Sequence, residues 1–168
     1  MTAQRQEANG LRLQLALFTV LASLFGAPCH YFAASASTTE RIVVGRYSGL
    51  AIGGFDPVAY FTDSTAALGV ADFEVREGGA VWRFRNEGNR ASFIAHPEIY
   101  GPQFGGYDPV DIGRGVTYPG NPRLWVVTGQ RLYLFGREES RDAFAADPQR
   151  ALKDAIARWP ALERDLSQ

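Results

Sequence analysis

One stretch of this chain of 168 residues occurs twice, and the duplication limits the folds that are open to it. The run GGFDPV at 53–58 returns as GGYDPV at 105–110, an offset of 52. The run VWRF at 81–84 then matches LYLF at 132–135, an offset of 51, and this register holds as far as Pro97. A loop insertion of one residue explains the change of offset. We therefore expect two similar folded units of about 51 residues.

Each copy predicts the same order of elements: a glycine-rich turn, a β-hairpin and a short helix. Asp before Pro favours a turn at the start of each copy. β-branched and aromatic residues on both sides of a glycine are typical of a hairpin. Acidic residues or Asn stand where each helix begins, and they suit a helix N-terminus. The expected strands are 73–76, 81–84, 124–127 and 132–135, and the expected helices are 87–95 and 138–146.

A further helix is expected after Asp147, which stands as N-cap before Pro148 at the first helical position. Its apolar residues recur at helical spacing and predict a face that packs on the rest of the domain: Ala151, Leu152, Ala155, Ile156 and Trp159. Pro160 is expected to end this helix. The first copy has room for a single turn at 97–100, because Gly101-Pro102 follows it.

These elements predict an α+β fold: one small domain of two tandem hairpin-plus-helix units that share one core, with a C-terminal helix. A unit of this length buries too little apolar surface to be stable alone, so the hairpins should form a common sheet or pack face to face. Residues 37–48 are expected to be a linker, in which Ile42–Val44 is a candidate edge strand. The duplicated domain then spans 49–160, and 161–168 form a tail.

The first 36 residues are typical of an export signal. Residues 1–12 are polar and carry two arginines, residues 13–27 are largely apolar, and the run AASAS at 33–37 has small side chains. This order indicates a secretory signal peptide cut after Ala36, and the apolar run is shorter than the ~20 residues of a transmembrane helix. An uncleaved anchor is the alternative. We therefore expect an exported protein, in the bacterial periplasm or anchored at the inner membrane, with membrane contact only through this segment.

Charge and cysteine content exclude some classes of partner and cofactor. The formal net charge is -1, and the sequence gives no sign of the basic face that binds nucleic acid. Cys29 is the single cysteine, and it lies in the expected signal segment. The mature chain would therefore have no intramolecular disulfide and no thiolate for a zinc or copper site. Its cofactors are otherwise unknown.

Three stretches of the sequence resemble the YHS domain family. They are GLAIGGFDPVAYFTD at 49–63, VWRFRNEGNRASFIAHPEIYGPQFGG at 81–106 and RLYLFGREESRDAFAADPQRALKDAIARWP at 131–160. The chain is most similar to the exported bacterial branch called YHS domain-containing (seleno)proteins. The resemblance extends from Gly49 to Pro160 and implies the fold of that family and an exported setting.

The same resemblance points to residues that this chain lacks. Members of the branch carry Cys or selenocysteine just after the second Gly-Gly-aromatic, and that position is Asp108 here. Many other YHS domains have Cys directly after Asp-Pro-Val, where this chain has Ala59 and Asp111. The metal or redox role proposed for the family therefore does not carry over on these residues.

Asp56, Asp108 and Asp111 are the carboxylates of the repeated turns. One interpretation is a cleft between the copies, where they bind a ligand by hydrogen bonds or hold calcium, magnesium or manganese. The alternative is that their side chains accept hydrogen bonds from nearby backbone amides of the Asp-Pro turns. His96, the one histidine after residue 36, joins Asp108 and Asp111 as a candidate metal ligand. Capping or plain exposure is the alternative for His96.

Aromatic residues are frequent around the glycine turns, and most of them are expected in the core. Some are candidates to line a small pocket beside the second turn, where glycine lets a backbone approach a ligand closely. The candidate ligand-binding residues are Asp56, Gly105, Gly106, Tyr107 and Asp108. Arg114 and Arg123 are candidate contacts for an anion, with plain solvation as the alternative.

The sequence contains no nucleophile elbow, zinc-protease motif, phosphate-binding loop or dinucleotide fingerprint. The leading hypothesis is a non-enzymatic exported binding or accessory module of the YHS type that lacks the thiol centre of the family. One alternative is a metal-binding protein with oxygen and histidine ligands. The other is a redox or enzyme accessory subunit that acts with a partner. The ligand, a small molecule or a protein partner, is unknown.

Overall fold

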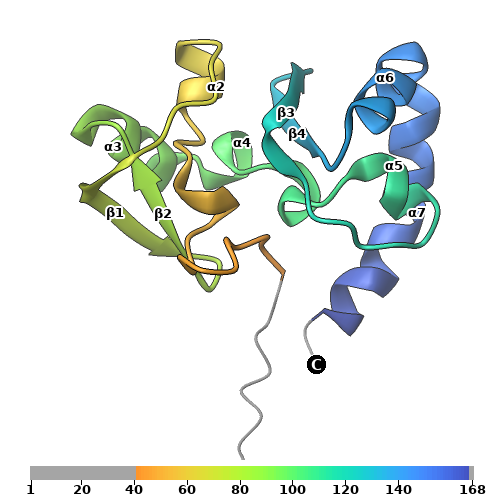
Figure 1. The fold of residues 1–168 in the computed structure, drawn as a ribbon, viewed down its shortest axis with the longest axis horizontal. Helices are drawn as coiled ribbons and strands as arrows, with labels where there is room; N and C mark the ends of the chain where they lie inside the picture. The colour runs from red at the N-terminus through yellow and green to blue at the C-terminus, as the bar shows by residue number, and fades with distance from the viewer. Residues whose placement is uncertain (1–40, 167–168) are drawn as a thin grey trace, which may run out of the picture. The chain divides into compact units, whose positions relative to one another are not determined.

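The structure, a computed structural model, describes residues 41–166, and its elements fall into two similar series (Figure 1). The first copy consists of η1 (Ile52–Gly54), α2 (Ala59–Thr62), β1 (Val70–Glu77), β2 (Ala80–Phe84), α3 (Glu87–Ala95) and α4 (Pro97–Tyr100). The second copy consists of η2 (Gln103–Gly106), α5 (Pro109–Gly113), β3 (Asn121–Thr128), β4 (Arg131–Phe135), α6 (Glu138–Ala146) and α7 (Pro148–Asp165). The expected α+β fold of two hairpin-plus-helix units with a C-terminal helix is confirmed.

Each copy has its own antiparallel hairpin. β1 pairs with β2, and β3 pairs with β4, in two separate two-stranded sheets. Both hairpins turn through two residues with positive φ, Gly78-Gly79 and Gly129-Gln130, as a tight turn that follows the strand twist requires. Both ladders are also irregular at the same place, after Val70 and after Asn121. The duplication therefore extends to the details of strand pairing.

Of the two expected arrangements, a common sheet or face-to-face packing, the common sheet is not formed within the described residues, and the pairing of the strand edges gives the reason. Leu50 bridges Val81 of β2 in parallel, and Pro102 bridges Leu132 of β4 in the same way. The segment that precedes each glycine turn thus lies along the open edge of its own hairpin. Since a strand can pair on only two sides, β2 and β4 are not available to each other.

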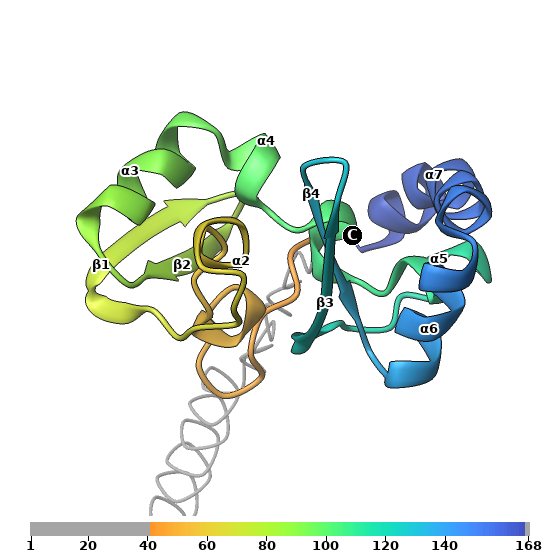
Figure 2. The same cartoon turned by 90° about the horizontal axis from the view of Figure 1, so that it is seen from above.

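One core is shared by both copies, as expected. Most of its buried side chains come from the first copy, from residues 51–60, β2 and α3, and Leu132 and Leu134 of β4 join them from the second. Tyr60 of α2 packs edge-to-face on Trp125 of β3, with 5.2 Å between the ring centroids. Figure 2 shows β3 and β4 between the first copy and helices α5, α6 and α7.

β4 is buried on both faces, because alternate residues of a strand point to opposite sides. Leu132 and Leu134 face the shared core. Tyr133 and Phe135 point the other way and pack with Phe144 of α6. β4 is therefore the strand through which the two copies pack on each other.

The helices that follow the hairpins have the bounds expected from the sequence. Asn86 caps α3 and accepts a hydrogen bond from the Asn89 amide at 2.8 Å. Asp147 caps α7 and accepts from the Arg150 amide at 3.0 Å. α4 ends after one turn at Gly101, also as expected.

The expected end of the last helix at Pro160, and with it the tail expected from 161, is wrong: α7 continues to Asp165. Its apolar side chains continue past the proline and pack against the cluster of Tyr107, Ile112 and Ala155; they are Trp159, Leu162 and Leu166. This burial outweighs the hydrogen bond that proline cannot donate. The expected packing of Ile156 is also wrong, since this side chain is 63% exposed.

The candidate edge strand before the first copy does not join either sheet. Val44 makes an isolated bridge with Ala51. The Val43 amide donates to the Gly105 carbonyl oxygen at 2.8 Å, and the Ile52 amide donates to the Val43 carbonyl oxygen at 2.8 Å. This segment therefore links the glycine turn of one copy to that of the other.

No helix within residues 41–166 is long and apolar enough to cross a membrane. The expected signal peptide or anchor at 1–36, including Cys29, lies outside the described residues and stays a prediction.

Candidate functional site

Asp56 precedes α2 and has a fully buried side chain. One of its carboxylate oxygens accepts from the Val58 amide at 2.9 Å. The other accepts from the Arg85 amide at 2.8 Å and from the side-chain amide of Asn89 at 2.7 Å. The carboxylate thus joins the first glycine turn to the end of β2 and the start of α3.

Asp108 has the same place in the second copy and is also fully buried. Oδ1 accepts from the Val110 amide at 2.9 Å and from the Asp111 amide at 3.4 Å, and Oδ2 accepts from the Gly136 amide at 2.8 Å. These bonds are those of a turn-stabilising acceptor, the alternative that the sequence left open. A ligand-binding role for Asp56 and Asp108 stays a prediction.

Asp111 is 3% exposed and lies between two arginines. Its Oδ1 accepts from Arg114 at 3.1 Å, and its Oδ2 accepts from Arg137, the residue before α6. The Arg137 guanidinium also lies over the Tyr118 ring, 5.0 Å from its centroid. Two positive neighbours stabilise the carboxylate and oppose the approach of a further cation. The first copy has Ala59 at this place, so the ion pairs are specific to the second copy.

His96 lies between α3 and α4, with its Nδ1 3.5 Å from a carboxylate oxygen of Glu98. Its side chain is exposed and makes no capping bond to α4, while its backbone amide caps the end of α3 by donating to the Ser92 and Phe93 carbonyl oxygens. His96 belongs to the first copy, whereas Asp108 and Asp111 belong to the second. Among residues 41–166, no three His, Cys, Asp or Glu side chains gather so that they could hold a metal ion. The proposed metal role of these three residues stays a prediction.

Three consecutive residues of each glycine turn have a left-handed backbone, Ile52-Gly53-Gly54 and Phe104-Gly105-Gly106. Such a φ is strained for the side chains of Ile52 and Phe104. At Gly105 glycine is also required by space, since a Cβ there would lie 1.8 Å from the Arg41 carbonyl oxygen. The backbone that approaches this glycine closely is thus part of the chain itself.

A groove of about 540 Å³ lies beside the second glycine turn, where a ligand pocket was expected. Tyr107 lines it, with Pro119 and the segment from Ile42 to Arg46. The two candidate anion contacts are engaged elsewhere. Arg114 pairs with Asp111, and the Arg123 guanidinium lies over the Phe55 ring at 5.2 Å.

Tyr60 links the two copies through its hydroxyl, which donates to the Pro122 carbonyl oxygen at 2.8 Å. Burial raises the pKa of Tyr60 far above its ordinary value of 10.0, and the charge of Asp56 adds to this, while Arg123 acts in the opposite direction. The hydroxyl therefore keeps its proton near neutral pH and serves as a hydrogen-bond donor within the fold.

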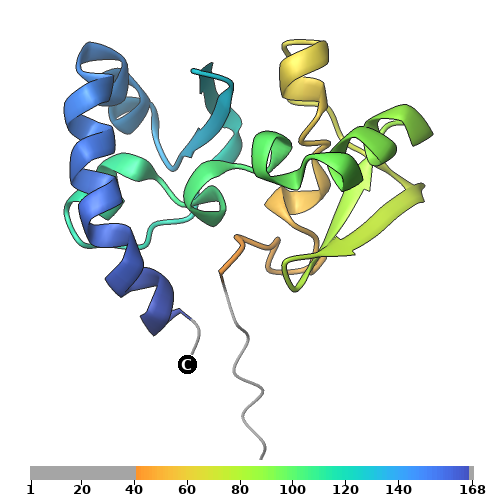
Figure 3. The same ribbon diagram turned by 180° about the vertical axis from the view of Figure 1, so that it is seen from behind.

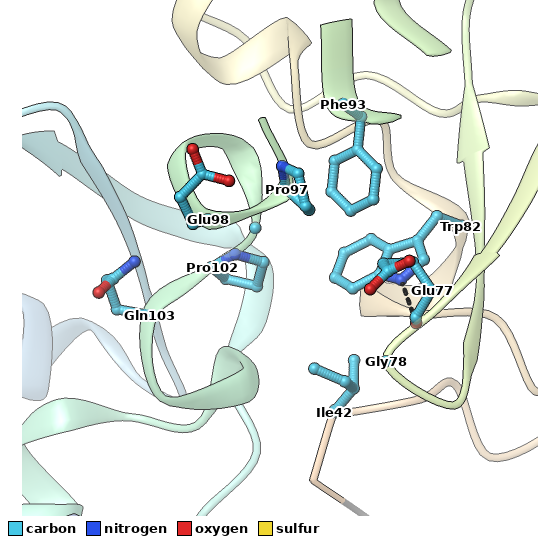
Figure 4. A pocket seen from close by; sticks show the side chains of 10 residues that line it. Ile42, Glu77, Gly78, Trp82, Phe93, Pro97, Glu98, Pro102 and Gln103 are labelled. Atoms are coloured by element: carbon cyan, nitrogen blue, oxygen red, sulfur yellow. Dashed lines mark hydrogen bonds between the residues drawn. The ribbon is translucent and has the colours of Figure 1, made fainter. Parts of the chain in front are cut away.

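A further cavity, of about 220 Å³, opens between the first hairpin and the start of the second copy. Trp82 and Phe93 form one wall, Pro97 and Pro102 stand opposite, and Ile42 lies at one end (Figure 4). The remaining lining residues are Glu77, Gly78, Glu98, Gly101 and Gln103. We call this cavity the aromatic–proline pocket. Figure 3 shows how α4 and η2, which carry the prolines' side of it, run from the first copy to the second.

The aromatic wall of this pocket is fixed by the fold. The rings of Trp82 and Phe93 have centroids 4.9 Å apart and are inclined by 38°. The Trp82 Nε1 donates to the Glu77 carbonyl oxygen at 3.0 Å, so its one polar atom already has a partner. The wall therefore offers apolar and aromatic surface in a set position, which is what a preformed ligand site needs.

The second copy has the same aromatic pair and covers it. Tyr133 and Phe144 replace the tryptophan and the phenylalanine, with centroids 5.2 Å apart and rings inclined by 39°. There the last helix continues beyond its first turn, and Ala151 and Leu152 pack on the cluster to which these two rings belong. The chain thus supplies an aliphatic cover for the aromatic pair of the second copy.

In the first copy the equivalent helix stops. α4 ends at Tyr100, and Gly101-Pro102 stand where the second copy continues with Leu152-Lys153. The aromatic–proline pocket is therefore the space that a continued helix would fill. Sequence reasoning noticed the short helix but not the pocket. The sequence did contain a signal for the pocket. Gly101 stands where the second copy has the apolar Leu152, although both copies keep the aromatic pair.

Comparison of the chain with protein-family models, with curated proteins and with solved structures gave no match. The resemblance to the YHS family stays a prediction from the motifs quoted above.

Proposed function

We propose that this protein is a non-enzymatic binding module whose ligand site is the aromatic–proline pocket. One observation carries the proposal. The same aromatic pair occurs in both copies. In the second copy Ala151 and Leu152 of the last helix pack on its cluster, whereas in the first the pair of Trp82 and Phe93, 3% and 1% exposed, lines a cavity. Because the first copy has no side chain in place of Leu152, an external group can bind in the cavity beside its aromatic pair.

The size and lining of the pocket support a small ligand or one side chain of a larger one. Its volume of about 220 Å³ lies below the ~300–1,000 Å³ of pockets for drug-sized ligands. Its walls are mainly aromatic rings and prolines, with a few polar groups at the edges. This lining matches the usual pattern of sites that bind through apolar contact and orient through few polar groups.

The buried carboxylates support a binding role over catalysis. Asp56 and Asp108 accept backbone amides, and Asp111 pairs with two arginines. A general acid or base must be within reach of a substrate proton, and these carboxylates are fully or almost fully buried. The arginines on Asp111 also count against the alternative of a metal-binding protein.

The proposed binding function is compatible with the export of the protein that the sequence predicts. An exported protein of the YHS type fits the N-terminal pattern of residues 1–36 and the motifs between Gly49 and Pro160. The absence of a thiol at Ala59, Asp108 and Asp111 fits a member that binds without the metal or redox chemistry proposed for the family.

A fragment screen by NMR tests the proposal. The full-length chain is mixed with small apolar and amphiphilic compounds while the indole N–H signal of Trp82 is followed, its assignment taken from Trp82→Phe. We expect binders that shift this signal, and Ile42→Phe should weaken them because it fills one end of the pocket. Val44→Phe, in the same segment but outside the pocket lining, should leave them unchanged.

Two results would count against the proposal. One is a folded chain in which no compound moves the Trp82 signal. The other is a set of binders that Val44→Phe weakens, which would place binding in the groove beside Tyr107, because Val44 lines that groove and not the pocket. A thermal-shift panel of divalent metals on the same sample tests the metal alternative separately.

A further inference from the structure

The aromatic–proline pocket has negative charge at its edge and no positive charge in its lining. Glu77 and Glu98 are lining residues, and none of the lining residues is Lys, Arg or His. Glu77 adjoins the aromatic wall, since its carbonyl oxygen accepts from the Trp82 Nε1 at 3.0 Å, the bond that Figure 4 draws as a dashed line. The ends of Glu98 and Gln103 point away from the aromatic wall in the same view. Glu77 is therefore the charge that a ligand in the pocket would meet.

The Glu77 carboxylate makes no ion pair within residues 41–166. On the same strand Glu74 pairs with Arg83 at 2.6 Å. Arg131 donates to the carbonyl oxygen of Glu98 and is not among the lining residues. The described part of the chain supplies no positive partner for Glu77, so a positive group on a ligand could pair with it.

The covered copy shows what kind of group suits the aromatic pair. There the cover includes Leu152, an aliphatic side chain, and no charge stands at the positions equivalent to the two glutamates: Thr128 replaces Glu77 and Gln149 replaces Glu98. The open copy therefore keeps the aromatic pair, lacks the aliphatic group and adds negative charge. An external group that replaces the cover should be aliphatic and positively charged.

We propose that the pocket binds a small organic cation, a branched aliphatic group about the size of a leucine side chain that carries an ammonium. This inference rests on the proposed binding function. The aliphatic part contacts Trp82, Phe93 and the facing prolines. The ammonium lies at the Glu77 carboxylate, where ionic attraction adds to the apolar contact.

Three probes with the same branched body test the charge. They are 3-methylbutylammonium, 3-methylbutanol and 3-methylbutanoate, each titrated into the full-length chain with the Trp82 indole signal as readout. We expect the ammonium to bind roughly threefold more tightly than the alcohol, as one exposed charge allows, and the carboxylate to bind most weakly. Glu77→Gln should make the ammonium and the alcohol equal. Asp72→Asn, the same loss of charge on the same strand but outside the lining, should preserve the difference.

The outcomes separate the two proposals. Equal affinities for the ammonium and the alcohol, with both shifting the Trp82 signal, would overturn the cation and leave the binding function in place. A preference for the ammonium that survives Glu77→Gln would overturn the role of Glu77 in this inference. If none of the three probes moves the signal in a folded chain, the inference fails, and the wider fragment screen decides the function of the pocket by itself.

Discussion

At the scale of single residues, Asp56 and Asp108 show why a carboxylate suits this turn. Two backbone amides, one inside the turn and one just after the second strand, point at the same buried place in each copy. Leaving a buried amide without an acceptor costs about 1–3 kcal/mol, and a carboxylate satisfies both with its two oxygens. The resemblance to the YHS family puts Cys or selenocysteine at 108, and sulfur is a much weaker acceptor. Asp108 therefore gives the turn a stronger anchor than a thiol would.

The two glycine turns offer a matched pair of substitutions. Gly53 and Gly105 have almost the same φ, 66° and 63°, so alanine meets the same left-handed strain of about 1 kcal/mol at both. A Cβ at Gly53 meets nothing closer than 4.0 Å, whereas one at Gly105 would collide with the Arg41 carbonyl oxygen. We expect Gly53→Ala to lower the unfolding free energy by about 1 kcal/mol and Gly105→Ala by about 3 kcal/mol.

Urea unfolding of both variants measures this difference. Equal losses would mean that the segment at Arg41 moves aside at no cost, and that its contact with the second copy contributes little. A larger loss in Gly105→Ala would show that the bond from the Val43 amide to the Gly105 carbonyl oxygen holds this segment in place.

At the scale of elements, local signals account for what the sequence predicted well. The hairpins, α3, α6 and the start of α7 all follow from residues close in sequence, such as Gly78-Gly79 at a turn and Asp147-Pro148 at a helix start. The same signal at Asp108-Pro109 also begins a helix, α5, with Asp108 as N-cap. Sequence reasoning expected only a turn there, because the helix is five residues long and has no apolar repeat to reveal it.

The features that sequence did not reveal depend on residues far apart along the chain. A common sheet was excluded by Leu50 and Pro102, which lie along the strand edges. The pocket exists because Pro97 and Pro102 stand opposite Trp82 while the helix between them is cut short. Neither arrangement follows from periodicity or turn residues, which describe one element at a time.

Pro160 in α7 gives a prediction for one element. Pro160→Ala should raise the unfolding free energy by about 1–2 kcal/mol, because alanine restores the missing amide of the helix interior and removes the clash of the ring. The freer unfolded chain offsets part of the gain. Pro148→Ala in the same helix should give no gain, since proline is favourable at the first helical position. Urea unfolding followed by circular dichroism compares the two, and a Pro160→Ala no more stable than the parent chain would show that α7 bends to fit its neighbours at this residue.

At the scale of the whole domain, neither copy completes its core alone. The first copy needs Leu132 and Leu134 from β4, and β4 in turn carries Tyr133 and Phe135 on its other face. Removal of the first copy would expose the Leu132 and Leu134 face of β4 to water, and removal of the second copy would take these two side chains from the core of the first. Cooperative unfolding of residues 41–166 as one unit follows from this shared strand, and the contacts across the copies should then affect the stability of both.

Tyr60 tests that coupling, because its hydroxyl bonds to Pro122 of the other copy. Tyr60→Phe should lower the unfolding free energy near neutral pH by about 1–2 kcal/mol, since the partly buried Pro122 carbonyl loses its donor. The pH dependence has a definite sign. The pKa of Tyr60 is raised in the folded state, so above its ordinary value of 10.0 the unfolded chain loses the proton first, and stability falls as pH rises.

Tyr60→Phe removes this contribution, so its stability should fall less than that of the parent chain between about pH 8 and about pH 11. Burial also raises the pKa of Tyr133, which leaves part of the alkaline loss in the variant. Tyr47, 99% exposed, supplies the matched control, and Tyr47→Phe should follow the parent at both pH values. Urea unfolding at the two pH values gives the comparison. The same alkaline loss in Tyr60→Phe as in the parent would show that the contact between Tyr60 and Pro122 opens before the domain unfolds, and that other contacts hold the copies together.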